Sequence, residues 1–116
     1  MSSRGDLESI RDVREAIARI QRYLKGVSYK RFLKDTKTQD AVVRNLEVIG
    51  EAAKGISSDF KKEHKGIDWK GMAGMRDRLI HHYFGVNLDI VWSVVNGKLP
   101  ELQTRTAKMV KIRRPK

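Results

Sequence analysis

The stretch LESIRDVREAIARIQRYL (Leu7–Leu24) places an apolar residue at every third or fourth position. These positions are Leu7, Ile10, Val13, Ile17, Ile20 and Leu24. Such spacing is typical of an amphipathic helix with one apolar face. We expect Asp6 to cap its first turn and Gly26 to end it, because acceptor side chains favour helix starts and glycine favours helix ends. One apolar face needs other helices to cover it.

The next segments supply those helices. Val42, Leu46, Ile49, Ala53 and Ile56 repeat the spacing, which predicts a helix from about Thr38 to Lys54 ended by Gly55. SYKRFL (28–33) could form a short helical turn with Tyr29 and either Phe32 or Leu33 packed inward. SSDFKKEH (57–64) predicts a short polar helix capped by Ser57 or Ser58. We therefore expect the first half of the chain to consist of helices and the short segments between them.

The second half continues the pattern. From Asp68, helical spacing recurs at Trp69, Met72, Met75 and Leu79, although Gly71 and Gly74 weaken the first turns. Asn87 should cap LDIVWSVVNG (88–97), with Leu88, Val91, Trp92 and Val95 inward. Pro100 suits the start of a last helix that carries Leu99, Leu102 and Met109. No segment alternates like a strand, so the predicted fold class is all-α, an antiparallel bundle of four to five main helices.

Length and composition limit the class of protein. The 116 residues are 40% hydrophobic and lack cysteine, which predicts one domain over 1–116 without disulfides or thiolate metal sites. No apolar run could cross a bilayer and the N-terminus lacks a signal-peptide core, so we expect a cytoplasmic protein with no membrane contact. The net charge of +11 makes a polyanion such as RNA the leading partner.

Two surface features remain open from the residues alone. The basic tail, from about residue 110 to 116, is either a solvated helix end or an arm that contacts RNA or a partner. Its cations, with those just before it, are Arg105, Lys108, Lys111, Arg113, Arg114 and Lys116, against the single acid Glu101. Ile90, Val94 and part of the Val42 and Val43 face are additional apolar positions, which favours a homodimer.

The stretch GMRDRLIHHYFG (74–85) carries more polar chemistry than packing requires. Arg76 and His81 are about 140° apart on an ideal helix, whereas Arg78 and His81 share a face. A basic cleft edged by Arg76, Arg78, His81 and Tyr83 would suit phosphate, since guanidinium binds phosphate oxygens and imidazole titrates near neutrality. These groups are those that metal-free RNA cleavage needs, with a general base and a charge stabiliser.

Other interpretations of the same residues exist. A histidine at a helix end can simply interact with the helix dipole, and Arg76-Asp77-Arg78 can form surface ion pairs. His81 and His82 point to different sides of a helix and no metal-ligand spacing occurs, so we expect neither a metal nor another cofactor. Trp69 and Trp92 fall on apolar stripes and are expected in the core rather than stacked on bases.

The segment from Arg76 to Tyr83, RDRLIHHY, resembles the R-x4-H-x-Y motif of the HepT toxins, a branch of the HEPN superfamily (higher eukaryotes and prokaryotes nucleotide-binding). The likeness extends over KTQDAVVRNLEVIGEAAK (37–54), IDWKGMAGMRDRLIHHYFGVNLDIVWSVV (67–95) and LPEL (99–102). It implies a helical homodimer in which the motif helices of both protomers line one composite cleft. It also implies metal-independent endoribonuclease activity.

By position, the resemblance gives each motif residue a role. Arg76 would steady the phosphate and the transition state, and His81 would be the general base or acid. Asp77, the polar residue usual after the motif arginine, would orient Arg76. Arg78 and Tyr83 would help to hold RNA. His82 stands at the variable position of the motif, so either histidine could titrate in the cleft, and the motif spacing favours His81.

The resemblance also implies a partner, a minimal nucleotidyltransferase antitoxin (MntA) that transfers AMP from ATP onto Tyr83. The added negative charge and bulk would block an RNA phosphate. The predicted function is therefore the toxin of a type VII-like HEPN/MNT toxin–antitoxin pair. The alternatives are a non-catalytic subunit that presents nucleotide or substrate to such a nucleotidyltransferase, and a plain basic RNA-binding bundle.

Overall fold

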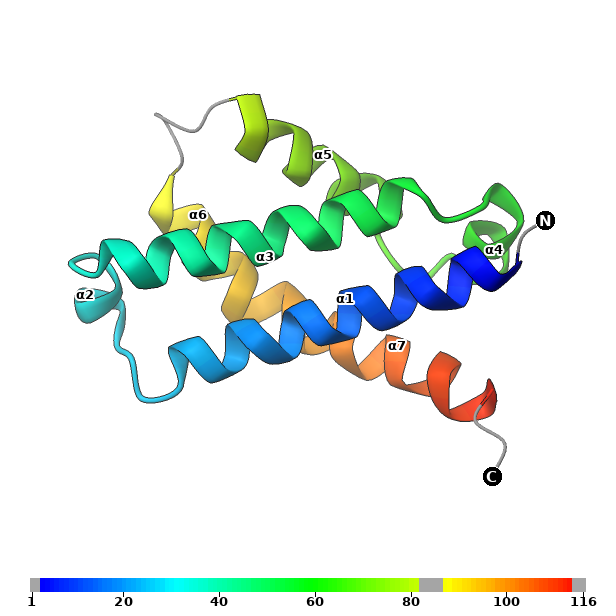
Figure 1. The fold of residues 1–116 in the computed structure, drawn as a ribbon, viewed down its shortest axis with the longest axis horizontal. Coiled ribbons are helices and arrows are strands. Elements are labelled where there is room, and N and C mark those ends of the chain that lie inside the picture. The colour runs from blue at the N-terminus through cyan, green and yellow to red at the C-terminus, as the bar shows by residue number, and fades with distance from the viewer. Residues whose placement is uncertain (1–2, 82–86, 114–116) are drawn as a thin grey trace.

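Two long antiparallel helices, α1 (Ser3–Leu24) and α3 (Thr36–Lys54), lie side by side along the length of the fold (Figure 1). The structure, a computed structural model, describes residues 3–81 and 87–113. Both helices contribute fully buried side chains to the core: Ile10, Val13, Ile17 and Ile20 from α1, and Val42, Leu46, Ile49 and Ala53 from α3. This confirms both apolar stripes, although Leu7 and Leu24 at the ends of the first are only partly buried.

The start of α1 differs from the expectation. The helix begins at Ser3, so Asp6 lies within its first turns and does not cap it. The Asp6 carboxylate instead accepts hydrogen bonds from the backbone N–H (2.8 Å) and hydroxyl (2.7 Å) of Ser57. Ser57 caps α4 (Ser58–Glu63), as expected. The Asp6 carboxylate, which the local sequence predicted as the cap of α1, therefore serves a tertiary contact with Ser57.

The start of α3 lies close to its predicted position. Asp35 caps the helix, accepting bonds from the Thr38 backbone N–H (3.1 Å) and hydroxyl (2.7 Å). These bonds, from the hydroxyl first and then the N–H, hold the pKa of Asp35 below its usual value because they favour the charged carboxylate. Gly55 follows the last residue, Lys54, as predicted.

Aromatic contacts tie the short helices to the bundle. The chain leaves α1 through Gly26, whose φ of +74° suits glycine, and enters α2 (Tyr29–Phe32). Phe32 is fully buried, whereas Leu33 is exposed. The rings of Tyr29 and Phe32 lie 5.3 and 5.2 Å from that of Trp92 on α6 (Leu88–Ser93). Trp92 is thus a packing residue, as expected.

The last two predicted helices are joined end to end. Asn87 caps α6 as predicted, accepting from the backbone N–H groups of Asp89 and Ile90. A π-helical turn, η2 (Val94–Lys98), then leads directly into α7 (Leu99–Arg113). The Leu99 N–H donates to the carbonyl of Val94, five residues earlier, and Pro100 has no N–H to continue the regular pattern.

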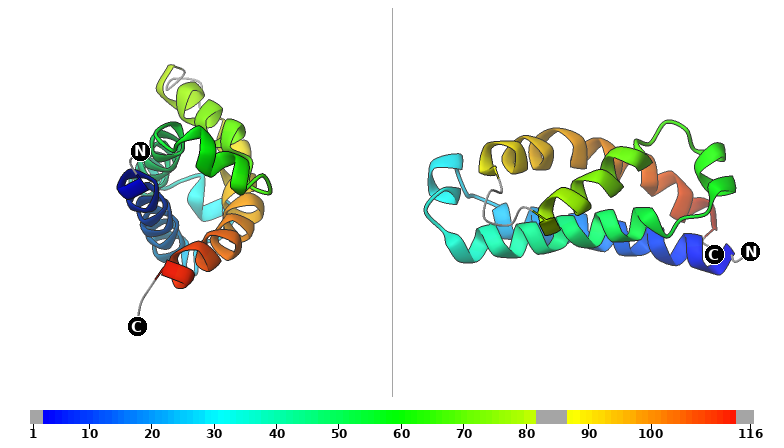
Figure 2. Two further views of the ribbon diagram at one scale, coloured as in Figure 1. Left: turned by 90° about the vertical axis from the view of Figure 1, so that its right-hand side faces the viewer. Right: turned by 90° about the horizontal axis from the view of Figure 1, so that it is seen from above.

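The remaining long helices pack on either side of the α1–α3 pair (Figure 2). α7 lies against α1, where Arg14 Nη1 donates to the Gln103 carbonyl (2.9 Å) and to the Thr106 hydroxyl (3.1 Å). α5 (Trp69–His81) lies against the other side of α3. The all-α fold class is confirmed. Among the described residues, no helix is long and apolar enough to span a membrane.

The extra apolar positions are not all surface positions. Val42, expected partly on an open face, is fully buried, because its side of α3 packs within the core. Val43 and Val94 are half-buried, and Ile90 is 57% exposed. The homodimer stays a prediction, as does the division of residues 1–116 into one domain and a basic tail from about residue 110.

Candidate active site

Helix α5 carries the polar motif and is fixed at both ends. At its start, Asp68 accepts from the Gly71 N–H (2.9 Å), and the Trp69 indole N–H donates to the His64 carbonyl (3.0 Å). Towards its end, Leu79 is buried in the core. Trp69 is buried too, which confirms it as a core residue. This anchoring leaves one orientation for α5 and so decides which motif residues face α3.

Gly50 allows α5 to approach α3 closely. A Cβ added at Gly50 would lie 2.7 Å from the Met72 carbonyl oxygen and 3.1 Å from the Arg76 Cα, and it would overlap the Arg76 Cβ. Atoms of backbone and Cβ cannot swing away as the end of a long side chain can. Only glycine therefore fits at this contact, and it places the base of the Arg76 side chain directly against α3.

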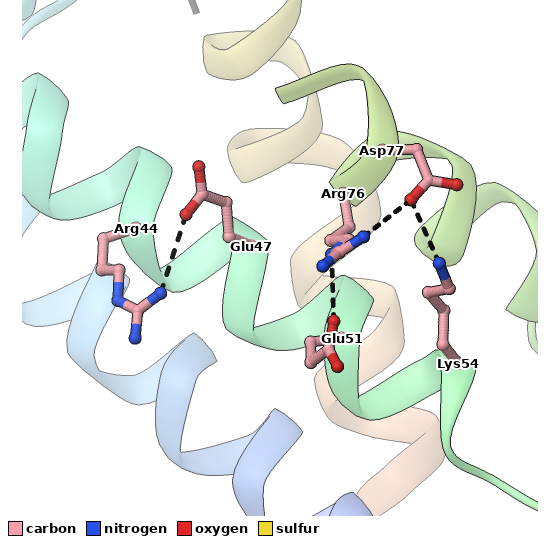
Figure 3. Close-up of polar contacts among 6 residues, drawn as sticks. All are labelled: Arg44, Glu47, Glu51, Lys54, Arg76 and Asp77. Carbon is pink, nitrogen blue, oxygen red and sulfur yellow. Dashed lines mark hydrogen bonds and ion pairs between the residues drawn. The ribbon is translucent and has the colours of Figure 1, made fainter. Parts of the chain in front are cut away.

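Four charged side chains meet beside this contact (Figure 3). Arg76 Nε forms an ion pair with Glu51 Oε1 at 3.0 Å, and its Nη1 donates to Asp77 Oδ1 at 3.0 Å. Lys54 Nζ donates to the same Asp77 oxygen at 3.2 Å. Arg76 is only 25% exposed. The guanidinium is thus held between a carboxylate of α3 and one of its own helix.

The electrostatics of Asp77 follow from its two donors. The hydrogen bond from Arg76, and after it the one from Lys54, lower the pKa of Asp77 below its usual value. Both donors are cations that favour the ionised carboxylate, and they outweigh the opposing effect of partial desolvation. Asp77 is therefore an anion at neutral pH and can keep Arg76 in place.

Arg76 borders an open hollow between α1, α3 and α5. It is lined by Ser9, Asp12, Arg44, Glu47, Val48, Glu51, Ala52 and Arg76. Arg44 and Glu47 form a second ion pair there, at 3.7 Å, one helical turn before Glu51 (Figure 3). With three carboxylates and two guanidinium groups, this hollow of the single chain is not basic in spite of the overall charge of +11.

Arg78 lines a different hollow on the other side of α5. This cavity, of about 260 Å³, lies between α5, η2 and α7. Its floor is apolar, with Met72, Met75 and Leu102 among the lining residues. Ion pairs stand at its edge, Lys98 with Asp68 at 3.9 Å and Arg105 with Glu101 at 3.3 Å. Two residues along a helix are about 200° apart, which explains the separation from Arg76.

The structure thus places only part of the predicted site. It brings Arg76 and Asp77 together, and within one chain it separates Arg76 from Arg78. His81 is the last residue of α5, and its side chain lies outside the described part of the structure. His82 and Tyr83 lie outside the described residues altogether.

Sequence reasoning missed Gly50, Glu51 and Lys54. A glycine inside an otherwise regular amphipathic helix was an available signal, because it costs about 1 kcal/mol relative to alanine and so indicates a close contact. Glu51 and Lys54 carried no such signal, since charged residues at that spacing are usual on a solvated helix face. Their role depends on which helix packs there.

Comparison with known proteins supplies the family. The HepT-like family, described as "Ribonuclease HepT-like", matches residues 13–109. This chain belongs to the HepT-like ribonuclease family. The match runs from α1 into α7 and includes the whole motif from Arg76 to Tyr83. The resemblance inferred from the sequence is confirmed.

Individual HepT-like relatives agree with the family match. The "Probable ribonuclease HepT" of Thermococcus cleftensis is 44% identical over 108 residues, which cover 93% of this chain and 98% of the relative. A "Putative RNase" of Methanocaldococcus jannaschii is 48% identical over 77% of this chain and 74% of its own length. A third, from Caldanaerobacter subterraneus, is 44% identical over 75% of this chain and 78% of its own length. No solved structure matches significantly.

Proposed function

We propose that this HepT-like protein is the toxin of a type VII-like HEPN/MNT toxin–antitoxin pair, a metal-independent endoribonuclease acting in the cytoplasm. The observation that carries the proposal is the family match over residues 13–109, together with the R-x4-H-x-Y residues at Arg76, His81 and Tyr83. The network around Arg76 supports it, because it holds a guanidinium in one place at the surface of the bundle.

The chemistry follows from these groups. His81, as a neutral imidazole, accepts the proton of the ribose 2′-hydroxyl while the 2′-oxygen attacks the adjacent phosphorus. The bond from phosphorus to the 5′-oxygen breaks, a 2′,3′-cyclic phosphate forms, and the 5′-oxygen leaves as a hydroxyl with a proton taken from water. Arg76 stabilises the charge that develops on the phosphoryl oxygens, and general base catalysis contributes about two to four orders of magnitude in rate. No step requires a metal.

The site is completed by a second copy of the chain. Positions 76 and 81 are about 140° apart around the α5 axis, so one helix does not present both to one phosphate. The hollow beside Arg76 also carries more carboxylates than cations. In a homodimer, the arginine of one protomer and the histidine of the other meet in one cleft, with Arg78, His82 and Tyr83 holding the RNA on either side.

The first experiment tests cleavage itself. The purified protein is incubated with RNA in excess chelator, and the fragments are resolved on a gel. We expect products with the wild-type protein, none with His81→Ala or Arg76→Ala, and products again with the control His64→Ala, whose ring packs against Phe60. His82→Ala should cleave more slowly than wild type. RNA binding without chelator-resistant cleavage would contradict the proposal and favour a non-catalytic binding subunit.

A mixing experiment tests the shared site. Arg76→Ala and His81→Ala proteins are each inactive, but a mixed dimer contains one site with both residues intact. Unfolding and refolding an equal mixture should restore about a quarter of wild-type activity, because half of the dimers are mixed and each has one working site of two. No recovery, in a mixture shown to contain mixed dimers, would place both residues of each site in one protomer.

The antitoxin is proposed to be an MntA-like minimal nucleotidyltransferase that inactivates the toxin through Tyr83. AMP attached to the tyrosine oxygen would place a phosphate where RNA must bind, and charge repulsion would exclude the substrate. With the antitoxin and ATP, intact mass should rise by whole AMP units and cleavage should cease. Tyr83→Phe should show neither change, and Tyr23→Phe, which alters an exposed tyrosine of α1, should behave as wild type. Labelling that persists in Tyr83→Phe would show that a residue other than Tyr83 carries the AMP group.

A further inference from the structure

The Arg76 side chain contacts two carboxylates, one from its own helix and one from α3. Asp77 is its neighbour in the chain, whereas Glu51 reaches it from α3, 25 positions earlier in the sequence. Arg76 Nη1 donates a hydrogen bond to Asp77, and its Nε lies 3.0 Å from Glu51 Oε1. The guanidinium is therefore fixed through Nε and Nη1, and its remaining edge can meet an anion.

We propose that Glu51 is a positioning residue, which holds the Arg76 guanidinium in the orientation needed to contact the scissile phosphate. This inference rests on the proposed ribonuclease function of Arg76. It adds a residue outside the R-x4-H-x-Y motif to the site and gives the α3–α5 contact a catalytic purpose.

Stability does not explain the Glu51–Arg76 ion pair. Glu51 is 66% exposed, and ion pairs of that kind contribute only about 0–1 kcal/mol because water screens them and both side chains lose freedom. Orientation is a different matter, because an error of about 1 Å in a catalytic group can reduce a rate by about a hundredfold. An arginine with four rotatable side-chain bonds needs such a fixed partner.

The neighbouring residues of α3 serve the same geometry. Gly50 lets the α5 backbone approach, so that the short reach of Glu51 is sufficient. Lys54, three positions later, donates to Asp77 and so steadies the other carboxylate that Arg76 contacts. Glu47, four positions earlier, has a different partner, Arg44. The chain therefore contains a matched control, a glutamate in the same hollow that does not touch Arg76.

A competing role for Glu51 makes an opposite prediction. If its carboxylate mainly neutralised Arg76, its removal would expose a full positive charge, and RNA would bind more tightly with no loss of turnover. If it positions Arg76, its removal lowers kcat and leaves KM nearly unchanged, because the lost interaction belongs to the transition state.

The experiment compares steady-state cleavage of a short RNA by wild type, Glu51→Ala, Glu51→Gln and Glu47→Ala. We expect kcat to fall at least about tenfold in Glu51→Ala with KM within about twofold of wild type. Glu51→Gln, which keeps an acceptor oxygen but no charge, should lie between the two. Glu47→Ala should keep the wild-type kcat. Tighter binding with undiminished kcat in Glu51→Ala, or an equal loss in Glu47→Ala, would overturn the proposal.

A second measurement does not depend on activity. Nuclear magnetic relaxation of the Arg76 Nε reports how rigid the guanidinium is, and we expect a rigid group in wild type and Glu47→Ala but a mobile one in Glu51→Ala. If wild type shows no cleavage, the proposed function fails, and a rigid Arg76 released by Glu51→Ala still supports the positioning contact. A guanidinium equally mobile in all three proteins would overturn the role of Glu51.

Discussion

Helix α3 has two sides of opposite kinds, one that faces the core and one that lies beside Arg76 of α5. Towards the core it presents side chains that are all fully buried, Val42, Leu46, Ile49 and Ala53. Beside Arg76 and Asp77 of α5 it presents a glycine and the charged pair Glu51 and Lys54. The same helix therefore holds the fold together on one side and places charged groups on the other.

Magnitudes indicate what each side of α3 is for. Burying one large aliphatic side chain stabilises a protein by about 1.5–3 kcal/mol, and the core side of α3 buries several. Each exposed ion pair at the α3–α5 contact contributes about 0–1 kcal/mol. The core side of α3 therefore accounts for far more of the stability than the ion pairs do, and charge placement is a better reason for the composition of the side beside Arg76.

The largest expected effect on stability comes from a substitution in the buried core. Leu46→Ala removes a fully buried side chain and should lower the free energy of unfolding by about 2–5 kcal/mol, from lost burial and the cavity left behind. Urea denaturation followed by circular dichroism measures it. The molecules that remain folded should cleave RNA at the wild-type rate. A loss below about 1 kcal/mol would show that α1 and α3 repack freely, contrary to the close packing of interiors.

An intermediate effect is expected from Gly50→Ala, which separates α3 from α5. Alanine in a helix interior normally gains about 1 kcal/mol over glycine. Here the new methyl group would overlap the Arg76 Cβ and approach the Met72 carbonyl, so overpacking of about 1–3 kcal/mol should prevail. The variant should be less stable by urea denaturation and should cleave RNA poorly, because Arg76 moves away from Glu51.

Gly74→Ala is the matched control for that substitution. Gly74 lies in α5, and a Cβ there would meet nothing within 4 Å. Its replacement should stabilise the protein by about 0.5–1 kcal/mol through helix propensity alone. If both glycine variants were stabilised, the close approach at Gly50 would not exist in solution.

The same contrast explains what the sequence could predict. The apolar stripes and the caps at Ser57 and Asn87 depend on local spacing and local hydrogen bonds, and they were predicted correctly. Asp6 was misplaced because its acceptor oxygens serve Ser57, 51 positions away. The π-helical turn before Pro100 was missed because it leaves the apolar spacing almost unchanged.

The candidate site divides in the same way. Arg76 and Asp77 are adjacent in the chain, so their contact could be foreseen from the motif. The contact from Glu51 could not, because it depends on which face of α3 receives α5. The shared cleft expected for Arg76 and Arg78 does not form within one chain, since the helix turns them to opposite sides. Whether two chains unite them stays a prediction.

The smallest expected effect is on stability at acid pH, and it tests how much the ion pairs of Asp77 contribute. Because Arg76 and Lys54 lower the pKa of Asp77 in the folded state below its usual value, this carboxylate stabilises the fold fully above its unfolded pKa. That stabilisation is lost as the pH falls through the folded pKa.

Asp77→Asn should therefore weaken the dependence of unfolding free energy on pH below about pH 4, measured by urea denaturation at low salt. Lys54→Met, which removes one of the two donors, should give an intermediate slope. An unchanged slope in Asp77→Asn would mean that the ion pairs of Asp77 contribute nothing measurable in solution, and the Arg76 orientation would then depend on Glu51 alone.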